Sequence, residues 1–188
     1  MHRAQSPPRK YDEYAYVLDF NSRGKSQTVR GRDGIIVTAI GENRLTILEI
    51  LGIPNSTFEI GEKIYIGKEG RTKVLSVLGK MEYDKISSSA QSELETVVEN
   101  IVTENESKFV EYLNNAQPLT PRIHALELIP GIGKIYMKNM LEEREKKKFE
   151  SYRDLQERIG LKEPIKHISE RIMDELTGES RMNLFVKR

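Results

Sequence analysis

Residues 122–148 read RIHALELIPGIGKIYMKNMLEEREKKK, with the turn Pro130-Gly131-Ile132-Gly133 at their centre. Glycine adopts positive φ angles without strain, so the two glycines allow a tight reversal of the chain. Four apolar residues before the turn predict a short helix that runs into it: Ile123, Leu126, Leu128 and Ile129. Three apolar residues after it have helical spacing and predict a second helix from Lys134: Met137, Met140 and Leu141.

The turn resembles the helix-hairpin-helix motif, in which Gly-hydrophobic-Gly is followed by a basic residue, here Gly131-Ile132-Gly133-Lys134. The first N–H groups of a helix have no partner within it and lie at the positive end of its dipole, where they can bind phosphate. The resemblance implies backbone contacts to phosphate, a buried Ile132, and charged contacts from Lys134 and Lys138. Met137 stands where the motif has a small residue, so a packing corner without a ligand is the alternative.

Residues 151–178 look like a decayed second copy of this arrangement. Ser151 begins a helix that Gly160 ends, and Pro164 begins a helix that Gly178 ends. The predicted buried stripe of the last helix is Ile165, Ile168, Ile172, Met173 and Leu176. Lys162 replaces the second glycine of the turn, so this copy is expected to complete a four-helix core rather than bind phosphate.

Residues 14–80 contain five stretches that are rich in strand-forming residues and separated by glycines: 14–20, 35–40, 45–51, 62–66 and 73–78. Five short strands in so short a span predict a small closed β-barrel, OB-like or SH3-like, because closure removes exposed strand edges. Strand alternation places Tyr14 and Tyr16 on the same face as Leu18 and favours their burial. The other interpretation is a base-stacking platform drawn from five aromatic residues: Tyr14, Tyr16, Phe58, Tyr65 and Tyr83.

Residues 21–34 form a long polar segment between the first two predicted strands. Its basic residues are Arg23, Lys25, Arg30 and Arg32, and its one acidic residue is Asp33. Such a loop on a barrel rim suits a flexible phosphate clamp; a solvated surface loop is the alternative. A P-loop is not indicated, because no G-x-x-x-x-G-K-[ST] pattern is present.

Residues 87–116 predict two helices. Ser87–Ser89 offers an N-cap, and an amphipathic stripe follows: Leu94, Val97, Val98, Ile101 and Val102. The outer face is acidic, which indicates solvation or a surface for a protein partner. The expected α+β organisation is a flexible tail (1–13), an OB-like barrel (14–86), a helical connector (87–117) and an all-α domain of paired helix-hairpin-helix motifs (118–188).

The 188 residues carry a formal net charge of +1, divided as +4 over residues 1–80, −6 over 81–115 and +3 over 116–188. This distribution permits nucleic-acid contact through local basic patches rather than through one broad face. The sequence has no cysteine, which excludes disulfides and thiolate metal sites. It has no long apolar run and no apolar stretch at the N-terminus, so we expect a cytoplasmic protein without a membrane partner.

Catalytic constellations are not indicated by the sequence. His2, His124 and His167 are far apart, and none has a metal-ligating neighbour at i+4. Asp19 and Asp33 are candidates for paired carboxylates across the barrel mouth, although no spacing rule identifies them. We therefore expect no cofactor and no metal site.

The order of barrel, helical connector and paired hairpins resembles an uncharacterised archaeal family of predicted RNA-binding proteins with an OB/TRAM-like barrel. The resemblance implies binding of nucleic acid, RNA in preference to DNA, through nine residues: Gly131, Ile132, Gly133, Lys134, Lys138, Arg23, Lys25, Arg30 and Arg32. Two alternatives stay open. One is a protein-protein adaptor built on the same modules, and the other is a nuclease or modification enzyme whose site is assembled only in the folded chain.

Overall fold

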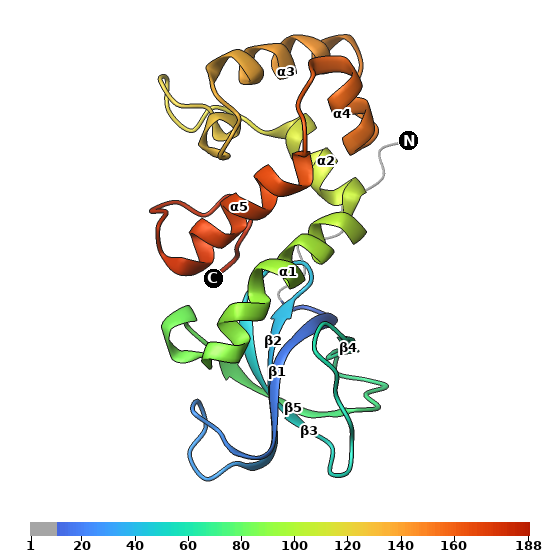
Figure 1. Ribbon diagram of the computed structural model, residues 1–188, viewed down its shortest axis with the longest axis vertical. Helices are drawn as coiled ribbons and strands as arrows, with labels where there is room; N and C mark the ends of the chain where they lie inside the picture. Colours follow the sequence, from blue (N-terminus) through green and yellow to red (C-terminus); the bar gives the residue numbers. More distant parts are fainter. Residues whose placement is uncertain (1–10) are drawn as a thin grey trace. The chain divides into compact units, whose positions relative to one another are not determined.

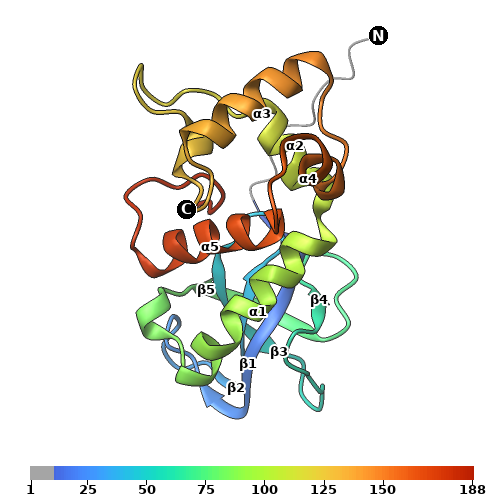
Figure 2. The same cartoon turned by 45° about the horizontal axis from the view of Figure 1, so that its top comes forward.

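The computed structural model describes residues 11–188 and divides the chain into two compact units (Figures 1 and 2). The sheet unit extends to Glu93 and includes Lys187 and Arg188, and the helical unit is Leu94–Val186. Most of the predicted tail, residues 1–13, lies outside the described residues, as does His2.

The sheet unit contains five antiparallel strands, β1 to β5, whose existence the sequence pattern predicted. Their bounds are Tyr14–Lys25, Asp33–Gly41, Ile47–Gly52, Lys63–Tyr65 and Val74–Lys80. The order across the sheet is β4-β1-β2-β3-β5, which makes β4 and β5 the two edges. The curled sheet is consistent with an OB-like barrel, but the expectation of a fully closed barrel is wrong for the described residues. Within residues 11–188, no strand pairing joins β5 to β4, which has only three residues.

Side chains span the opening between β4 and β5. The Arg71 guanidinium donates to the carbonyls of Ile66 at 3.1 Å and Gly67 at 2.6 Å, just after β4, and to the carbonyl of Leu75 in β5 at 3.2 Å. The ammonium of Lys73 forms an ion pair with Glu62. The contacts of Arg71 satisfy backbone carbonyls at this opening that have no partner in a strand ladder between β4 and β5.

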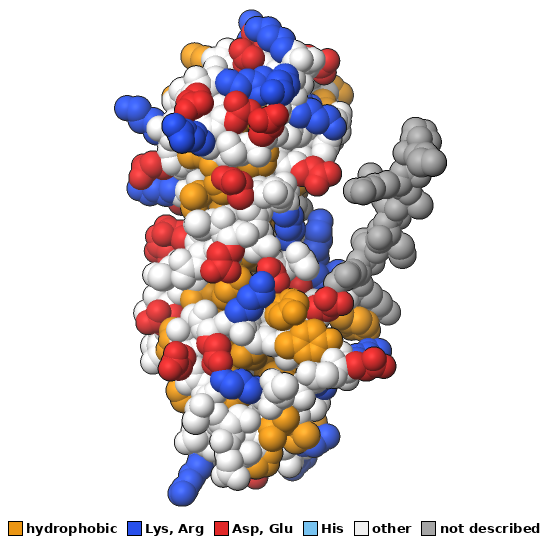
Figure 3. Space-filling view, turned by 90° about the vertical axis from the view of Figure 1, so that its right-hand side faces the viewer, with side chains coloured by type: hydrophobic (Ala, Val, Ile, Leu, Met, Phe, Trp, Pro, Cys, Tyr) orange, Lys and Arg blue, Asp and Glu red, His pale blue; other side chains and the backbone are white. Residues whose placement is uncertain are grey.

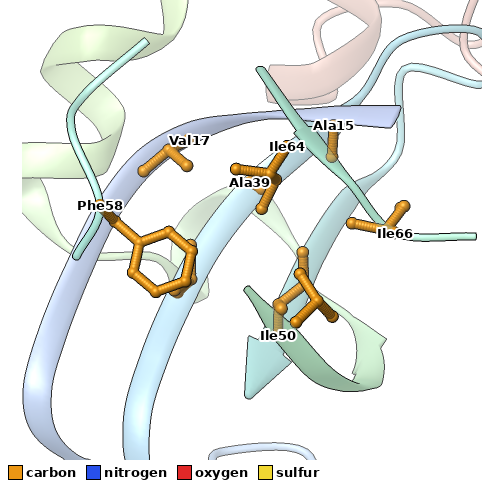
Figure 4. Packing of buried hydrophobic residues seen from close by; sticks show 9 residues of the cluster. Ala15, Val17, Ala39, Ile50, Phe58, Ile64 and Ile66 are labelled. Carbon is orange, nitrogen blue, oxygen red and sulfur yellow. The ribbon is translucent and has the colours of Figure 1, made fainter. Parts of the chain in front are cut away.

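The core of the sheet unit lies on the inner face of the curled sheet (Figure 4). Nine buried apolar residues form it: Ala15, Val17, Val37, Ala39, Ile50, Phe58, Ile64, Ile66 and Val74. Strand β1 is buried on both faces here, since Tyr16 and Leu18 alternate with the core residues and are also buried.

The helices are α1 (Ser88–Glu104), α2 (Glu106–Asn115), α3 (Lys134–Lys146), α4 (Tyr152–Ile159) and α5 (Pro164–Thr177), with short 3-10 turns η1 (Tyr83–Lys85) and η2 (Ala125–Leu128). The predicted N-cap of α1 is confirmed, because the Ser87 hydroxyl accepts the N–H of Ala90 at 3.0 Å. The five apolar residues predicted to form the stripe of α1 are all buried.

Helices α4 and α5 end and begin close to where the sequence pattern predicted. Ser151 caps α4 by accepting the N–H of Asp154 at 2.9 Å, and Gly160 ends it with φ +70°. Gly178 ends α5 with φ +82°. These helix ends could be predicted from the sequence because a capping hydroxyl and a left-handed glycine act on the backbone within one helical turn, independently of distant residues.

The predicted buried stripe of α5 is partly wrong. Ile168 and Ile172 are buried, whereas Ile165, Met173 and Leu176 are half-buried. Two charged residues, Arg171 and Glu175, are buried in addition and form an ion pair at 2.9 Å.

This ion pair ties three segments of the helical unit together. The Arg171 guanidinium donates to the carbonyl of Leu128 in η2 at 3.1 Å and to the carbonyl of Met182 at 2.6 Å. The Glu175 carboxylate accepts the N–H groups of Phe185 and Val186, each at 3.0 Å. The buried charges are thus paired and hydrogen-bonded, which is the condition under which a protein interior tolerates them.

Candidate nucleic-acid interface

The turn at the start of α3 has the expected sharp reversal, with one correction. Gly131 has φ +85° and needs the conformational freedom of glycine, whereas Gly133 has φ −79° and an extended backbone that other residues can adopt. Ile132 between them is 2% exposed, as expected for the residue that anchors the turn.

Gly131 is also required by packing. A Cβ atom at this position would overlap the imidazole ring of His167 in α5. Nδ1 of His167 is buried and has no hydrogen-bond partner among residues 11–188. The ring of His167 therefore packs against the turn at Gly131.

The N-terminus of α3 is open to solvent. Gly133 is the N-cap residue and provides no side-chain cap, and a Cβ added to it would meet no atom within 4 Å. Within residues 11–188, no acceptor pairs with the backbone N–H groups of Lys134, Ile135 and Tyr136. The exposed side chains of Lys134 and Lys138 lie on the same helix. Such a terminus has the donors and the dipole direction that bind an anion.

The segment before the turn is shorter than predicted. It is the single 3-10 turn η2, and Ile123, expected to be one of its apolar residues, is 41% exposed. His124 begins η2 through a capping box, in which its Nδ1 accepts the N–H of Leu126 at 3.1 Å and Glu127 accepts the N–H of His124 at 3.2 Å. Burial, reinforced by the nearby charge of Arg144, lowers the pKa of His124. This histidine has a structural role in the turn.

The second glycine turn repeats the backbone features of the first. Gly160 has φ +70°, and Leu161 after it is 1% exposed, as Gly131 and Ile132 are arranged in the first turn. The N-cap of α5 differs, because Glu163 occupies it with φ +53° and an exposed carboxylate. A carboxylate at this end of a helix repels phosphate.

The basic loop of the sheet unit is shorter than predicted. Strands β1 and β2 remain paired as far as Lys25 opposite Asp33, so the loop spans residues 26–32 rather than 21–34. Strand pairing was missed here because the polar residues at the ends of β1 and β2 lack the apolar alternation of a buried strand. We call β1, the loop and β2 from residue 21 to residue 34 the basic hairpin.

All four predicted basic side chains of the basic hairpin are exposed. Arg23 and Lys25 lie at the end of β1, and Arg30 and Arg32 lie in the loop. Within residues 11–188, none of the four has an ion-pair partner. Their charges are therefore available to an external anion.

The first half of the loop is bound to Glu49 of β3, which is 2% exposed. The Glu49 carboxylate accepts the N–H of Gln27 at 2.9 Å, the hydroxyl of Thr28 at 2.7 Å and the hydroxyl of Ser26. These hydrogen bonds favour a held loop over a flexible one at residues 26–28. Sequence inspection could not find this contact, because Glu49 is more than twenty residues away from its partners.

These hydrogen bonds also set the ionisation of Glu49. Burial raises the pKa of the carboxyl group, but the donors from Gln27, Ser26 and Thr28 together outweigh burial and leave the pKa below its ordinary value. Glu49 is therefore ionised at neutral pH, and its charge is held by the loop without a lysine or arginine.

Aromatic residues divide between the core and the surface. Tyr16 is buried, in agreement with prediction, whereas Tyr14 is 39% exposed and contradicts it; Phe58, a member of the proposed stacking platform, is buried as well. Tyr14 lies opposite Tyr65 of the edge strand β4, with ring centroids 5.4 Å apart, and the Lys63 ammonium lies 4.8 Å from the centre of the Tyr14 ring. The edge position of β4 leaves Tyr14 partly uncovered.

The candidate carboxylate pair is not assembled. Asp19 lies opposite Thr38 and accepts the Ser87 hydroxyl at 2.6 Å, whereas Asp33 lies at the far end of the hairpin opposite Lys25. Among the described residues, no group of three or more His, Asp or Glu side chains could hold a metal ion. None of the described helices is long and apolar enough to cross a membrane.

The described residues on the face drawn in Figure 3 form no single broad basic patch. On the face drawn in Figure 3, Lys and Arg side chains are interspersed with Asp and Glu side chains. The two candidate anion sites are therefore the basic hairpin in the sheet unit and the start of α3 in the helical unit.

A family model described as "Protein of unknown function (DUF655)" matches residues 11–187. The chain belongs to this family. The matched residues of this DUF655 protein include the basic hairpin, Glu49 and the start of α3.

Two relatives place the family in archaea. The uncharacterized protein MJ0038 of Methanocaldococcus jannaschii is 40% identical over 185 residues, which cover 97% of this chain and 83% of that protein. The crystal structure of Af1531 from Archaeoglobus fulgidus, described with the DUF655 family model, has a TM-score of 0.80 and 34% sequence identity. The match covers 94% of this chain and 100% of that chain. The expectation of an uncharacterised archaeal family with an α+β fold is confirmed.

Proposed function

We propose that this protein binds nucleic acid, RNA in preference to DNA, by contacting the sugar-phosphate backbone. The observation that carries the proposal is the basic hairpin, in which four exposed basic side chains, none of them ion-paired within residues 11–188, lie in or next to a loop held in place by Glu49. A fixed loop loses less conformational entropy on binding than a mobile one, so the same charged contacts give a higher affinity.

The fold of the sheet unit supports this assignment. OB-fold barrels bind oligonucleotides with the face of strands 2 and 3 and with the loop between strands 1 and 2. The basic hairpin is the β1–β2 connection of a sheet that is consistent with an OB-like barrel. Its four cations meet the requirement for backbone binding, which is contact with phosphates without regard to base sequence.

The start of α3 is the second proposed contact. We assign Gly131, Ile132, Gly133 and Lys134 to a helix-hairpin-helix-like turn whose open N–H groups receive one phosphate, with Lys134 and Lys138 beside it. An open helix N-terminus without a side-chain cap supports this assignment. Preference for RNA rests on the resemblance to predicted RNA-binding proteins, and single strands suit an OB-like surface.

A protein-protein adaptor is the second candidate, and one observation favours it. Ile135, in the first turn of α3, is 79% exposed beside the proposed phosphate site. An exposed aliphatic residue suits a protein partner as well as the edge of a nucleic-acid ligand. The two functions differ in their dependence on salt, because only binding to a polyanion releases many counterions.

The test is a salt titration of binding to single-stranded RNA and DNA of the same sequence. We expect affinity to fall steeply between about 50 and 200 mM salt and to favour RNA. Replacing Arg23, Lys25, Arg30 and Arg32 by Gln should lower the salt slope by about 3, since each phosphate bound on a single strand contributes about 0.7. An unchanged slope in this folded quadruple variant would reject the hairpin site, and no binding to either strand would reject nucleic acid in favour of the adaptor.

A further inference from the structure

Glu49 presents an unusual arrangement for a surface that we expect to meet phosphates. Its carboxylate is buried, ionised and surrounded by donors from one short loop. Within residues 11–188, no lysine or arginine forms an ion pair with it. The donors that collect around Glu49 are backbone N–H groups and hydroxyls, which are also the groups that bind anions in proteins.

The loop closes on itself around the same residues. The Ser26 hydroxyl, which donates to Glu49, accepts the N–H of Val29 at 2.8 Å, and the N–H of Ser26 donates to the carbonyl of Arg32 at 2.8 Å. Arg30 lies between these hydrogen bonds in the chain. The position of the Glu49 carboxylate is thus transmitted through Ser26 to the part of the loop that carries Arg30 and Arg32.

Strand β5 leaves space for residues 26–32 of the basic hairpin at Gly79. Gly79 of β5 lies directly opposite Glu49 in the sheet. A Cβ atom at Gly79 would lie 3.1 Å from Cβ of Thr28, closer than side chains normally approach. The absence of a side chain at Gly79 lets the loop lie against the sheet with Thr28 over this position.

We propose that Glu49 is the positioning residue of the basic hairpin: an internal carboxylate that occupies the loop's anion-binding donors and fixes Arg30 and Arg32 for contact with a phosphate chain. The inference rests on the proposed nucleic-acid function. It gives a negatively charged residue a supporting role in binding a polyanion, which electrostatics alone would not predict.

Replacing Glu49 by a neutral residue distinguishes positioning from simple electrostatics, because the two predict opposite changes in RNA affinity. Glu49→Gln removes a negative charge near four cations, so electrostatics alone would tighten binding of single-stranded RNA. Loss of positioning would weaken it. We expect Glu49→Gln to bind the RNA several-fold more weakly than the parent. Its salt slope should be lower by about 0.7 to 1.4, because each phosphate of a single strand that Arg30 or Arg32 no longer binds removes about 0.7.

Asp33→Asn is the matched control. Asp33 is an exposed carboxylate on the same basic hairpin, and its replacement makes the same change of charge without touching the hydrogen bonds of the loop. We expect Asp33→Asn to bind RNA at least as tightly as the parent. The double variant Ser26→Ala, Thr28→Val removes two donors to Glu49 with no change of charge and should reproduce the weakening.

Amide hydrogen exchange gives a readout that does not depend on the ligand. Glu49→Gln should increase exchange at Gln27 and Thr28 by about tenfold or more, since hydrogen bonds to a charged acceptor are among the stronger ones. Unchanged protection, or binding that tightens in Glu49→Gln as in Asp33→Asn, would overturn the role of Glu49. A parent protein that does not bind RNA, with exchange increased in Glu49→Gln, would instead reject the proposed function and leave Glu49 only as the anchor of the loop.

Discussion

Three glycines, at positions 131, 133 and 160, allow the two effects of a glycine turn to be measured separately. Gly131 has a positive φ and a Cβ position that would overlap His167, and Gly160 has a positive φ with no atom near its Cβ position. Gly133 has a negative φ and open space around its Cβ position. Alanine should therefore add strain and overlap at position 131, strain alone at position 160, and neither at position 133.

The magnitudes follow from these differences. A left-handed backbone costs alanine about 1 to 2 kcal/mol, partly offset by about 0.4 to 1 kcal/mol from the less flexible unfolded chain. Gly160→Ala should therefore reduce the free energy of unfolding by about 1 kcal/mol. Gly131→Ala must also displace the His167 ring and should cost about 2 to 4 kcal/mol, because overpacking adds about 1 to 3 kcal/mol. Gly133→Ala should lie within about 0.5 kcal/mol of the parent, since loss of the glycine N-cap and gain of chain stiffness oppose one another.

The assay is urea denaturation followed by helical circular dichroism, with the three variants and the parent measured together. A ranking of 131, then 160, then 133 in order of decreasing damage is expected. If Gly133→Ala were as damaging as Gly131→Ala, the backbone described for the turn would be wrong. If Gly131→Ala were harmless, His167 would not be packed against it.

The same comparison makes the phosphate site testable without the complication of misfolding. Because Gly133 needs no special backbone angle, Gly133→Val should fold normally and place a branched side chain beside the open N–H groups of α3. Its affinity for RNA and DNA should fall to a similar degree, since phosphate contacts carry no base information. Lys134→Gln should lower the salt slope by about 1. Parental binding by both folded variants would leave this turn as a packing corner.

Two further predictions concern buried charges. Glu175→Ala should lower the free energy of unfolding by about 3 to 5 kcal/mol, because it leaves the Arg171 guanidinium buried without its ion-pair partner. Replacing both residues by Met should lower it far less. Equal losses of the two variants in urea denaturation would refute this. The pKa of Glu49 is lower in the folded than in the unfolded chain, so its ionisation stabilises the fold above the unfolded pKa and that contribution is lost as pH falls through the folded value. The stability advantage of the parent over Glu49→Gln should accordingly shrink below about pH 4, and an advantage that grew in acid would contradict the lowered pKa.

Sequence reasoning succeeded where a local signal determines the structure. The stripe from Leu94 to Val102, the cap at Ser151 and the glycine stop at Gly160 each act within one or two helical turns. The start of α3 at Lys134 was predicted for the same reason, because a glycine turn followed by apolar residues at helical spacing describes that helix alone.

The failures share a different cause, since each depends on residues far away in the chain. Burial of Arg171 and Glu175 requires the carbonyls of η2 and the N–H groups near the C-terminus, which no helical pattern in α5 reveals. Exposure of Tyr14 follows from the shortness of its neighbour β4 at the edge of the sheet. The closed barrel was predicted from the number of strands, but closure depends on whether the last two edges can pair.

The two candidate anion sites differ in the same way, and this difference decides how each should respond to mutation. The start of α3 is a local site: its donors, its glycine and Lys134 are adjacent in sequence, and His167 supports it only from outside. The basic hairpin is a non-local site, because its cations are placed by a carboxylate on another strand and by the space left at Gly79 on a third. A change outside the cations can therefore disable the hairpin without altering its charge, as in Ser26→Ala, Thr28→Val. The α3 site should respond to changes within the turn and at His167, which packs against Gly131. If both sites bind the same RNA, the reductions of salt slope from the hairpin variants and from Lys134→Gln should add, because well-separated phosphate-binding groups contribute independently to counterion release.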